Sequence, residues 1–161
     1  MTIAENGLCK ISDKYFSDFS SPRHMFNKHE NRPYYLAIKR QNGIYWLIPL
    51  SSQVEKYRAK IQADEKTHGE SIFYHIAQVK GKESVFLIGN VIPVTEEYII
   101  GPFTVAGIPY VLANKEEIKA IRSKLSRYLA MVRNGKLHPS VDILEIERKL
   151  LSQKQNEDYI I

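Results

Sequence analysis

Residues 34–52 read YYLAIKRQNGIYWLIPLSS, and this stretch decides the fold. It contains two runs that are rich in β-branched and aromatic side chains, residues 34–39 and residues 44–50. Gln41-Asn42-Gly43 separates them, and Asn-Gly between two such runs is the strongest short-range signal for a β-hairpin. We therefore expect an antiparallel hairpin whose second strand ends at a pair of serines.

The segments on either side of the hairpin predict further short elements. Residues 10–19 indicate a helix, because their aromatic side chains lie at helical spacing and either Ser12 or Asp13 could cap it. Residues 51–62 are polar and predict a turn into a short helix, and residues 63–70 are expected to form a loop. A second pair of strands around a glycine is expected at residues 71–78 and 84–94.

The last third of the chain has the pattern of two helices. Asn114, with Glu117 three residues later, has the spacing of a helix N-cap. An apolar stripe then recurs every three or four residues, at Ile118, Ile121, Leu125, Leu129 and Val132. Gly135 favours the end of this helix, and Ser140 is expected to cap the next one. We expect residues 153–161 to form a frayed tail.

Strands followed by helices indicate the α+β class. We expect residues 10–112 to form a β core with short helices and residues 114–151 to form a helical hairpin. A chain of 161 residues is long enough for one domain, residues 1–161, with a substantial buried core.

The composition excludes several classes of protein. Hydrophobic residues make up 43% and charged residues 25%, which excludes a disordered or collagen-like chain. The longest apolar run, Ile44–Leu50, is far shorter than the roughly 20 residues of a membrane helix. Residues 1–10 have no secretory pattern, and Cys9 is the single cysteine, so we expect a cytoplasmic protein. No Cys/His cluster has zinc spacing, so no metal is expected.

The charge balance favours an acidic partner. Lysine and arginine number 23 against 18 acidic residues, which gives a net charge of +5 and an isoelectric point near 9.2. Nucleic acid is the first such partner to consider, although a mildly basic surface without a partner fits as well. The ten tyrosines, together with arginine, suit single-stranded RNA, whose bases stack on rings and whose phosphates bind cations.

Two candidate sites flank the hairpin. Ser51 and Ser52 follow the second strand, where a rigid scaffold presents hydroxyl groups at the surface; the alternative is that they only begin a turn or cap a helix. Cations approach and follow the first strand at Lys28, His29, Arg32, Lys39 and Arg40. Arg32 could grip a phosphate bidentately and His29 could transfer a proton near neutral pH, unless the segment is simply a solvated basic loop.

A third candidate is the first C-terminal helix. It carries seven basic residues, Lys115, Lys119, Arg122, Lys124, Arg127, Arg133 and Lys136, against two glutamates. Lys119, Arg122 and Arg133 fall on a face broadly opposite the apolar stripe, which could follow an RNA backbone. The alternative is an ordinary charged outer face.

Three segments in this order resemble one protein family. The predicted hairpin ends in Ile48-Pro49-Leu50-Ser51-Ser52, which has the family's pattern of apolar-Pro-apolar-Ser/Thr-Ser. Residues 86–94, FLIGNVIPV, resemble the family's apolar strand that ends in Ile-Pro-apolar. Residues 144–150, LEIERKL, match part of its helical tail. The chain, over residues 10–151, resembles the type III toxin–antitoxin endoribonucleases, a group that includes ToxN, AbiQ and CptN. The length and segment pattern are most similar to the CptN branch.

The resemblance implies a fold, an activity and a partner. The fold is a small, strongly bent antiparallel β-sheet barrel, similar to the MazF and Kid toxins, with helices. The activity is sequence-specific RNA cleavage without a metal or other cofactor. The partner is an antitoxin RNA that is made as tandem repeats, and the toxin cuts these repeats into pseudoknots. Toxin and RNA then form a closed assembly in the cytoplasm, in which protein and RNA alternate. Release of the toxin then halts growth or aborts phage infection.

The resemblance also assigns roles to residues. The family's hydroxyl pair falls on Ser51 and Ser52, and its basic residue before the first strand falls on Arg32. Its lysine after the pair is offset to Lys56, because Gln53-Val54-Glu55 replaces Pro-Lys-Lys. His29 could replace a family tyrosine in proton transfer.

The implied mechanism is attack by the RNA's own 2′-hydroxyl. Ser52 would hydrogen-bond the scissile phosphate, while Arg32 and Lys56 would offset its developing charge. The products would be a 2′,3′-cyclic phosphate and a 5′-hydroxyl.

Two other functions remain open on the sequence alone. A non-catalytic RNA-binding module could use Tyr34, Tyr45 and the basic helix, starting at Lys115, to hold RNA. A protein-interaction domain could present the same helix to an acidic protein.

Overall fold

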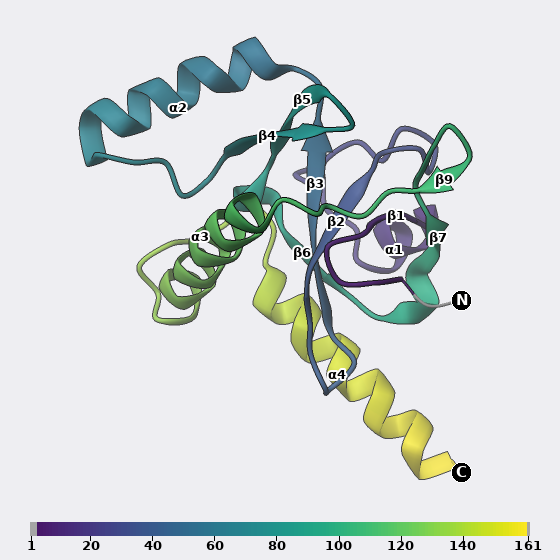
Figure 1. Ribbon diagram of the computed structural model, residues 1–161. Helices are drawn as coiled ribbons and strands as arrows, with labels where there is room; N and C mark the ends of the chain where they lie inside the picture. The colour runs from purple at the N-terminus through teal and green to yellow at the C-terminus, as the bar shows by residue number, and fades with distance from the viewer. Residues whose placement is uncertain (1–2, 161) are drawn as a thin grey trace.

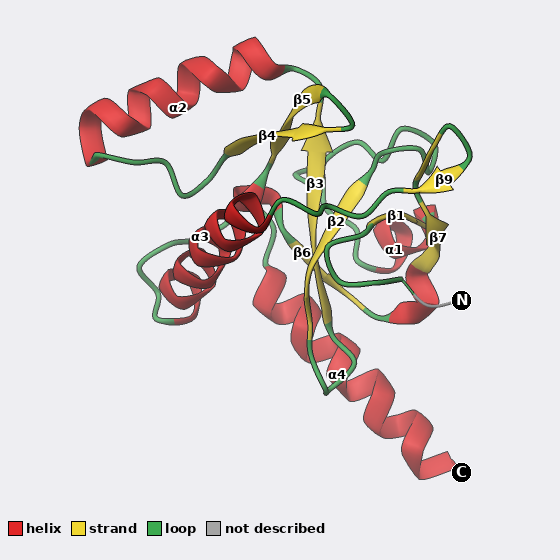
Figure 2. Ribbon diagram, viewed as in Figure 1, coloured by secondary structure: helices red, strands yellow, loops and turns green. Residues whose placement is uncertain are grey.

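The protein is built on an antiparallel sheet of seven strands, with helices on its faces (Figures 1 and 2). The computed structural model describes residues 3–160, and their side chains as far as residue 156. The strands of the sheet are β1 (Leu8–Ile11), β2 (Tyr34–Lys39), β3 (Tyr45–Ser51), β4 (His75–Val79), β5 (Lys82–Phe86), β6 (Ile92–Val94) and β7 (Ile99–Pro102). Their order is β4-β5-β3-β2-β1-β7, with β6 also paired to β3.

The predicted hairpin is confirmed and forms the centre of the sheet. β2 and β3 pair antiparallel from Tyr34 opposite Pro49 to Lys39 opposite Tyr45. At the turn, the Arg40 amide donates to the Ile44 carbonyl over 2.9 Å. Gly43 has a φ of +86°, a left-handed conformation that glycine adopts without steric cost. The turn therefore explains why glycine follows Asn42.

β3 is the strand on which the rest of the sheet depends. All seven of its residues are buried. One edge pairs with β2, while the other pairs with β6 at residues 45–47 and with β5 at residues 50–51. Because both of its faces are covered, the strand is apolar throughout rather than alternating.

The two predicted C-terminal helices are both present and pack on the sheet. α3 (Lys115–Arg133) contacts β2 and the short 3₁₀ turn η1 (Ile88–Asn90), and α4 (Ile143–Ile160) contacts β6. Fully buried residues of the two helices, among them Leu125 and Leu150, join the cluster that surrounds Trp46. In Figure 1, α4 runs behind the β2–β3 hairpin and extends past its tip.

Only one of the two N-caps predicted for these helices is confirmed. The Asn114 side chain accepts hydrogen bonds from the amides of Glu116 and Glu117, as predicted. The prediction that Ser140 caps α4 is wrong, because Asp142 accepts from the Glu145 amide instead. The prediction of a frayed tail at 153–161 is wrong for residues 153–160, which continue α4, and Ile161 lies outside the described residues.

Two predicted boundaries are wrong for physical reasons. α2 (Val54–His68) covers most of the predicted loop at 63–70 and ends at Gly69, whose φ is +85°. Only Tyr57 of this helix is buried, so it has no apolar stripe to reveal it. The segment at 10–19 begins as strand β1, and α1 spans only Asp13–Asp18, because β1 is inserted between β2 and β7.

The expected barrel, similar to MazF and Kid, is not formed. The antiparallel sheet and C-terminal helices of the α+β prediction are present, but within residues 3–160 the end strands β4 and β7 do not pair with each other. β8 (Thr104–Val105) and β9 (Ile108–Pro109) form a separate small hairpin. Among the described residues, no helix combines the length and apolar character needed to cross a membrane.

The cap assignment can be tested with two neighbouring variants. Asp142→Ala should lower the free energy of unfolding by about 1 kcal/mol, because it leaves the Glu145 amide without its acceptor. Ser140→Ala should leave it nearly unchanged. Urea unfolding of both variants measures the difference, and the reverse order of effects would restore Ser140 as the cap.

Candidate functional site

The two serines after β3 have different surroundings. Ser51 is buried, pairs with Val85 of β5, and its hydroxyl accepts a hydrogen bond from the Gln53 amide over 3.2 Å. Ser52 is exposed, and its hydroxyl makes no hydrogen bond to any residue in the described part of the chain. Gln53, at the N-cap of α2, has no side-chain cap bond, so Ser52 does not cap that helix. Ser51 thus fixes the turn, while Ser52 presents a hydroxyl to solvent.

Arg32 holds this end of β3 in place. Its Nη1 donates to the Leu50 carbonyl over 2.8 Å, and its Nε donates to the Phe26 carbonyl over 2.6 Å. The residue is only 6% exposed. Two of its donors are therefore committed to backbone carbonyls, so the predicted open bidentate grip on a phosphate is absent here. Arg32 is a positioning residue that ties the start of β2 to the residue before the serine pair.

The segment before Arg32 is a left-handed turn. Lys28, His29 and Glu30 have φ values of +52°, +55° and +69°, a conformation that costs about 1–2 kcal/mol per residue without glycine. Tertiary hydrogen bonds hold it at both ends. Asn27 donates to the Ile11 carbonyl and to Asp13, and the Glu30 carboxylate accepts from the Asp13 amide. Strain of this kind is typical of functional loops, and here it leaves Lys28 and His29 exposed.

An exposed aromatic ring lies on the same turn. Phe26 is 63% exposed, and its ring centre lies 5.5 Å from that of His29 in an edge-on arrangement. An exposed ring between cations can stack on an unpaired RNA base. The sequence analysis did not single out Phe26, although an aromatic residue within a polar, basic stretch was a usable signal.

Lys56 lies in the first turn of α2, soon after the serine pair in the chain. Its ammonium group lies 5.1 Å from the centre of the Tyr57 ring, and Lys60 lies 5.7 Å from the same ring. Both lysines are exposed. The start of α2 therefore adds two positive charges next to the segment that follows Ser52.

Tyr34 and Tyr45, which were predicted to hold RNA, are both buried. Tyr34 is only 1% exposed and Tyr45 9%, so neither ring can stack on a base. Burial also raises the pKa of the Tyr34 hydroxyl above its ordinary value. Lys39 lies 5.1 Å from the Tyr45 ring, and with Arg40 it is at the hairpin turn, the opposite end from the serines.

Two of the cations predicted to contact RNA on α3 lie next to glutamate side chains. Arg133 makes two hydrogen bonds of 2.9 Å to the Glu147 carboxylate, which raises its pKa and ties α3 to α4. It is therefore part of the packing between the helices rather than an open phosphate contact. Arg122 lies 3.6 Å from Glu5 and keeps half of its side chain exposed. Lys115 and Lys119 are exposed.

The predicted site residues thus divide into two regions. The first region contains Ser51, Ser52, Lys56 at the start of α2, and Arg32, which binds the Leu50 carbonyl. Lys28 and His29 lie on the turn whose Phe26 carbonyl Arg32 also holds, and within the described residues no hydrogen bond joins them to the serines. The second region, on α3 and the hairpin turn, consists of Lys39, Arg40, Lys115, Lys119 and Arg122. Tyr34 and Tyr35 are consecutive residues of β2, so their side chains face opposite sides of the sheet. The positive charge of Arg122, a residue of α3, acts on the Tyr35 hydroxyl. α3 therefore lies on the face of the sheet away from Tyr34.

Two solved structures share this fold. No protein-family model matches the sequence, and no curated protein sequence matches it. One similar structure is ToxN, from a bacterial antiviral system that a processed non-coding RNA regulates, with a TM-score of 0.61, 17% identity and coverage of 89% of this chain and 96% of the other. The second is AbiQ, a lactococcal anti-phage endoribonuclease of the type III toxin–antitoxin system, with a TM-score of 0.55, 17% identity and coverage of 91% and 97%. At this identity the likeness shows the fold, in agreement with the resemblance seen in the sequence.

The positioning role of Arg32 predicts a large loss of stability. Arg32→Ala should lower the free energy of unfolding by about 2–4 kcal/mol, because two carbonyls lose a charged donor in a buried place. Arg40→Ala, at the exposed end of the same hairpin, is the control and should have little effect. Equal urea midpoints for the two variants would show that Arg32 does not hold the end of β3.

Proposed function

We propose that this protein is an endoribonuclease, the toxin of a type III toxin–antitoxin system. The observation that carries the proposal is the free Ser52 hydroxyl at the end of a fully buried strand, next to Ser51, which is itself held by a backbone amide. The fold is that of AbiQ, which is described as an endoribonuclease of this class. The exposed Lys28 and His29 supply an ammonium group and an imidazole on the turn that Arg32 joins to the end of β3.

The proposed reaction is attack by the ribose 2′-hydroxyl on the adjacent phosphorus. A bond forms between the 2′-oxygen and phosphorus, and the bond from phosphorus to the 5′-oxygen breaks. One proton leaves the 2′-hydroxyl and one is added to the departing 5′-oxygen. The RNA supplies its own nucleophile, so the protein needs only to move protons and stabilise the phosphorane. The products are a 2′,3′-cyclic phosphate and a 5′-hydroxyl, and no metal takes part.

The described residues suit these tasks. Ser52 donates a hydrogen bond to a non-bridging phosphate oxygen, and the rigid strand places the hydroxyl with little loss of entropy. Lys56 and Lys28 offset the charge of the phosphorane. His29 transfers a proton through its imidazole ring. Arg32 acts through the backbone of β3 rather than on the RNA.

The two cationic regions support binding of more than one RNA segment. The serine region and the α3 region contain different elements and lie at different places on the sheet. We propose that target RNA enters at the serine region, where the exposed Phe26 ring stacks on a base. A pseudoknotted antitoxin RNA then contacts both regions, which permits an alternating assembly of protein and RNA in the cytoplasm.

The central prediction concerns Ser52. Ser52→Ala should slow RNA cleavage a hundredfold or more, because loss of one oriented donor to the transition state costs about 3 kcal/mol. Its free energy of unfolding should change by no more than about 0.5 kcal/mol, since the hydroxyl is exposed. Cleavage of single-stranded RNA in EDTA, together with thermal unfolding, measures both effects.

The control for this test is Ser152→Ala, which removes another exposed hydroxyl, on α4. It should cleave RNA at the normal rate. Normal cleavage by Ser52→Ala would remove Ser52 from the reaction. RNA binding by the wild-type protein without any cleavage would instead favour a non-catalytic RNA-binding module.

The α3 region makes a separate prediction about salt. Replacing Lys115, Lys119 and Arg122 together by alanine should reduce the slope of log affinity against log salt for single-stranded RNA by about 2, if each residue contacts one phosphate. Arg133→Ala should leave the slope unchanged, because Glu147 already pairs with that side chain. An unchanged slope in the triple variant would make this face an ordinary solvated surface.

A further inference from the structure

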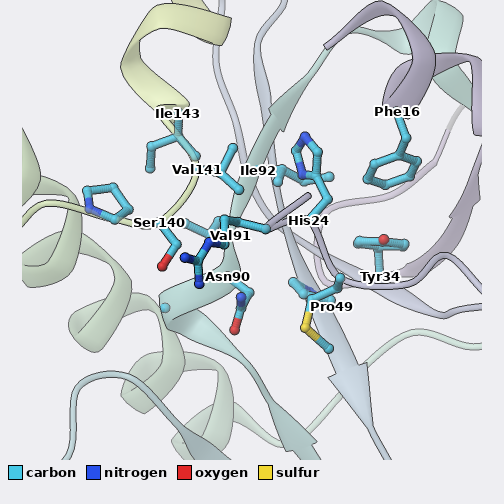
Figure 3. Close-up of a pocket in the computed structure, with 14 residues that line it drawn as sticks. Phe16, His24, Tyr34, Pro49, Asn90, Val91, Ile92, Ser140, Val141 and Ile143 are labelled. Carbon is cyan, nitrogen blue, oxygen red and sulfur yellow. The ribbon is translucent and has the colours of Figure 1, made fainter. Parts of the chain in front are cut away.

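Three side chains that can exchange protons lie together between α3 and β4. They are His75, the first residue of β4, and Glu117 and Lys124 of α3. None of the residue roles proposed above uses this cluster. The small cavity shown in Figure 3, between the sheet and the start of α4, is lined by no lysine, cysteine or carboxylate, so it does not hold a second cluster of this kind.

The three side chains form one chain of hydrogen bonds. Lys124 Nζ lies 3.0 Å from His75 Nδ1, and His75 Nε2 lies 2.7 Å from Glu117 Oε2. An ammonium group has only donors, so Nδ1 accepts from Lys124, and Nε2 carries the proton that is donated to Glu117. Glu117 and Lys124 are two helical turns apart on α3, which places both on the side of the helix that meets His75.

The surroundings of the cluster favour the uncharged forms of His75 and Lys124. The His75 side chain is only 13% exposed. Burial lowers the pKa of His75 and that of Lys124 below their ordinary values. Lys124 is nevertheless partly exposed, and Glu70 and Arg127, whose charges act on it, pair with each other at the surface. The amine is therefore shifted toward its reactive form at a place that small molecules can reach.

The cluster has the arrangement of an activated nucleophile. Covalent catalysis requires a nucleophile, a base within hydrogen-bond reach of it, and a third group that orients the base. Here these groups are the Lys124 amine, the His75 imidazole and the Glu117 carboxylate. A neutral amine can donate one N–H to Nδ1 and still keep its lone pair free for attack. Activated acyl groups are electrophiles that such an amine converts into a stable amide.

We propose that Lys124 is a site of acylation, at which His75 acts as the base and Glu117 orients the imidazole ring. The ammonium first loses one proton to solvent, and the neutral nitrogen attacks the carbonyl carbon of an acyl phosphate or acyl thioester. A carbon–nitrogen bond forms, and the bond from this carbon to the phosphate oxygen or thioester sulfur breaks. The second proton passes from the nitrogen to His75 Nδ1, and from there to solvent. The products are a neutral amide and a free phosphate or thiol.

Acylation changes the contact between α3 and β4. It replaces the positive charge of Lys124 by a neutral amide, and it removes the ammonium donor that lies 3.4 Å from the Tyr74 carbonyl. The reaction requires neither RNA nor the serine region, so it can be tested apart from RNA cleavage. Acyl phosphates and acyl thioesters deliver the same acyl group and are distinguished by experiment.

The first experiment compares two lysines of α3 in the wild-type protein. The protein is incubated at neutral pH with acetyl phosphate or with acetyl-coenzyme A, and acetylation of each lysine is followed by peptide mass spectrometry. With at least one donor, Lys124 should react about tenfold or more faster than Lys119, which is exposed, because general base catalysis accelerates such steps. Equal rates at the two lysines with both donors would overturn the proposal.

The second experiment tests His75 as the base. His75→Asn keeps an acceptor for Lys124 but cannot take up a proton, so acetylation of Lys124 should slow about tenfold or more while that of Lys119 is unchanged. The control is His68→Asn, which changes an exposed histidine at the end of α2 and should leave both rates unchanged. An unchanged Lys124 rate in a folded His75→Asn variant would show that His75 is only a packing partner and would overturn the proposal.

Glu117→Gln keeps the test decisive if His75→Asn does not fold. This variant retains an oxygen acceptor for His75 Nε2 and removes only the charge that stabilises the protonated ring. Acetylation of Lys124 should slow by a smaller factor than in His75→Asn, again with no change at Lys119. No slowing of Lys124 in a folded Glu117→Gln variant would contradict the role of the carboxylate.

Discussion

The bond from the Arg32 guanidinium to the Leu50 carbonyl is the interaction on which the site depends. It joins the start of β2 to the end of β3, and a second bond from the same guanidinium holds the Phe26 carbonyl. Removing this side chain would free the serine end of the sheet and the turn before it together. The geometry of the site therefore depends on this buried arginine as much as on the exposed groups around it.

The path of β3 explains why the candidate site lies at this end. The strand pairs with β2 along one edge, and along the other it passes from β6 to β5. Its last residue, Ser51, pairs with Val85 of β5, and α2 begins three residues later, at Val54. Ser52 lies between these two elements and is exposed, so its hydroxyl can reach a phosphate.

The sequence predicted the elements whose signals are local. The Asn42-Gly43 turn, the Asn114 cap and the apolar stripe of α3 each depend on a few neighbouring residues, and all are present. The sequence did not predict features that depend on residues far apart in the chain. Arg133 was predicted to be an open cation, but Glu147 pairs with it, and Tyr34 was predicted to hold RNA, but its side chain is buried. The predicted helix at 51–62 was too short, because only Tyr57 of α2 is buried and its end has no apolar stripe, and sheet closure has no local signal.

The central claim is that the protein cleaves RNA through the RNA's own 2′-hydroxyl at the serine end of β3. The most direct test is a single-stranded RNA that carries one 2′-deoxy nucleotide at the cleaved linkage, incubated with the purified protein in EDTA. The account predicts that the unmodified RNA is cut there to a 2′,3′-cyclic phosphate and that the deoxy linkage stays intact. Cleavage of the deoxy linkage, or cleavage of the normal RNA that stops in EDTA, would contradict it.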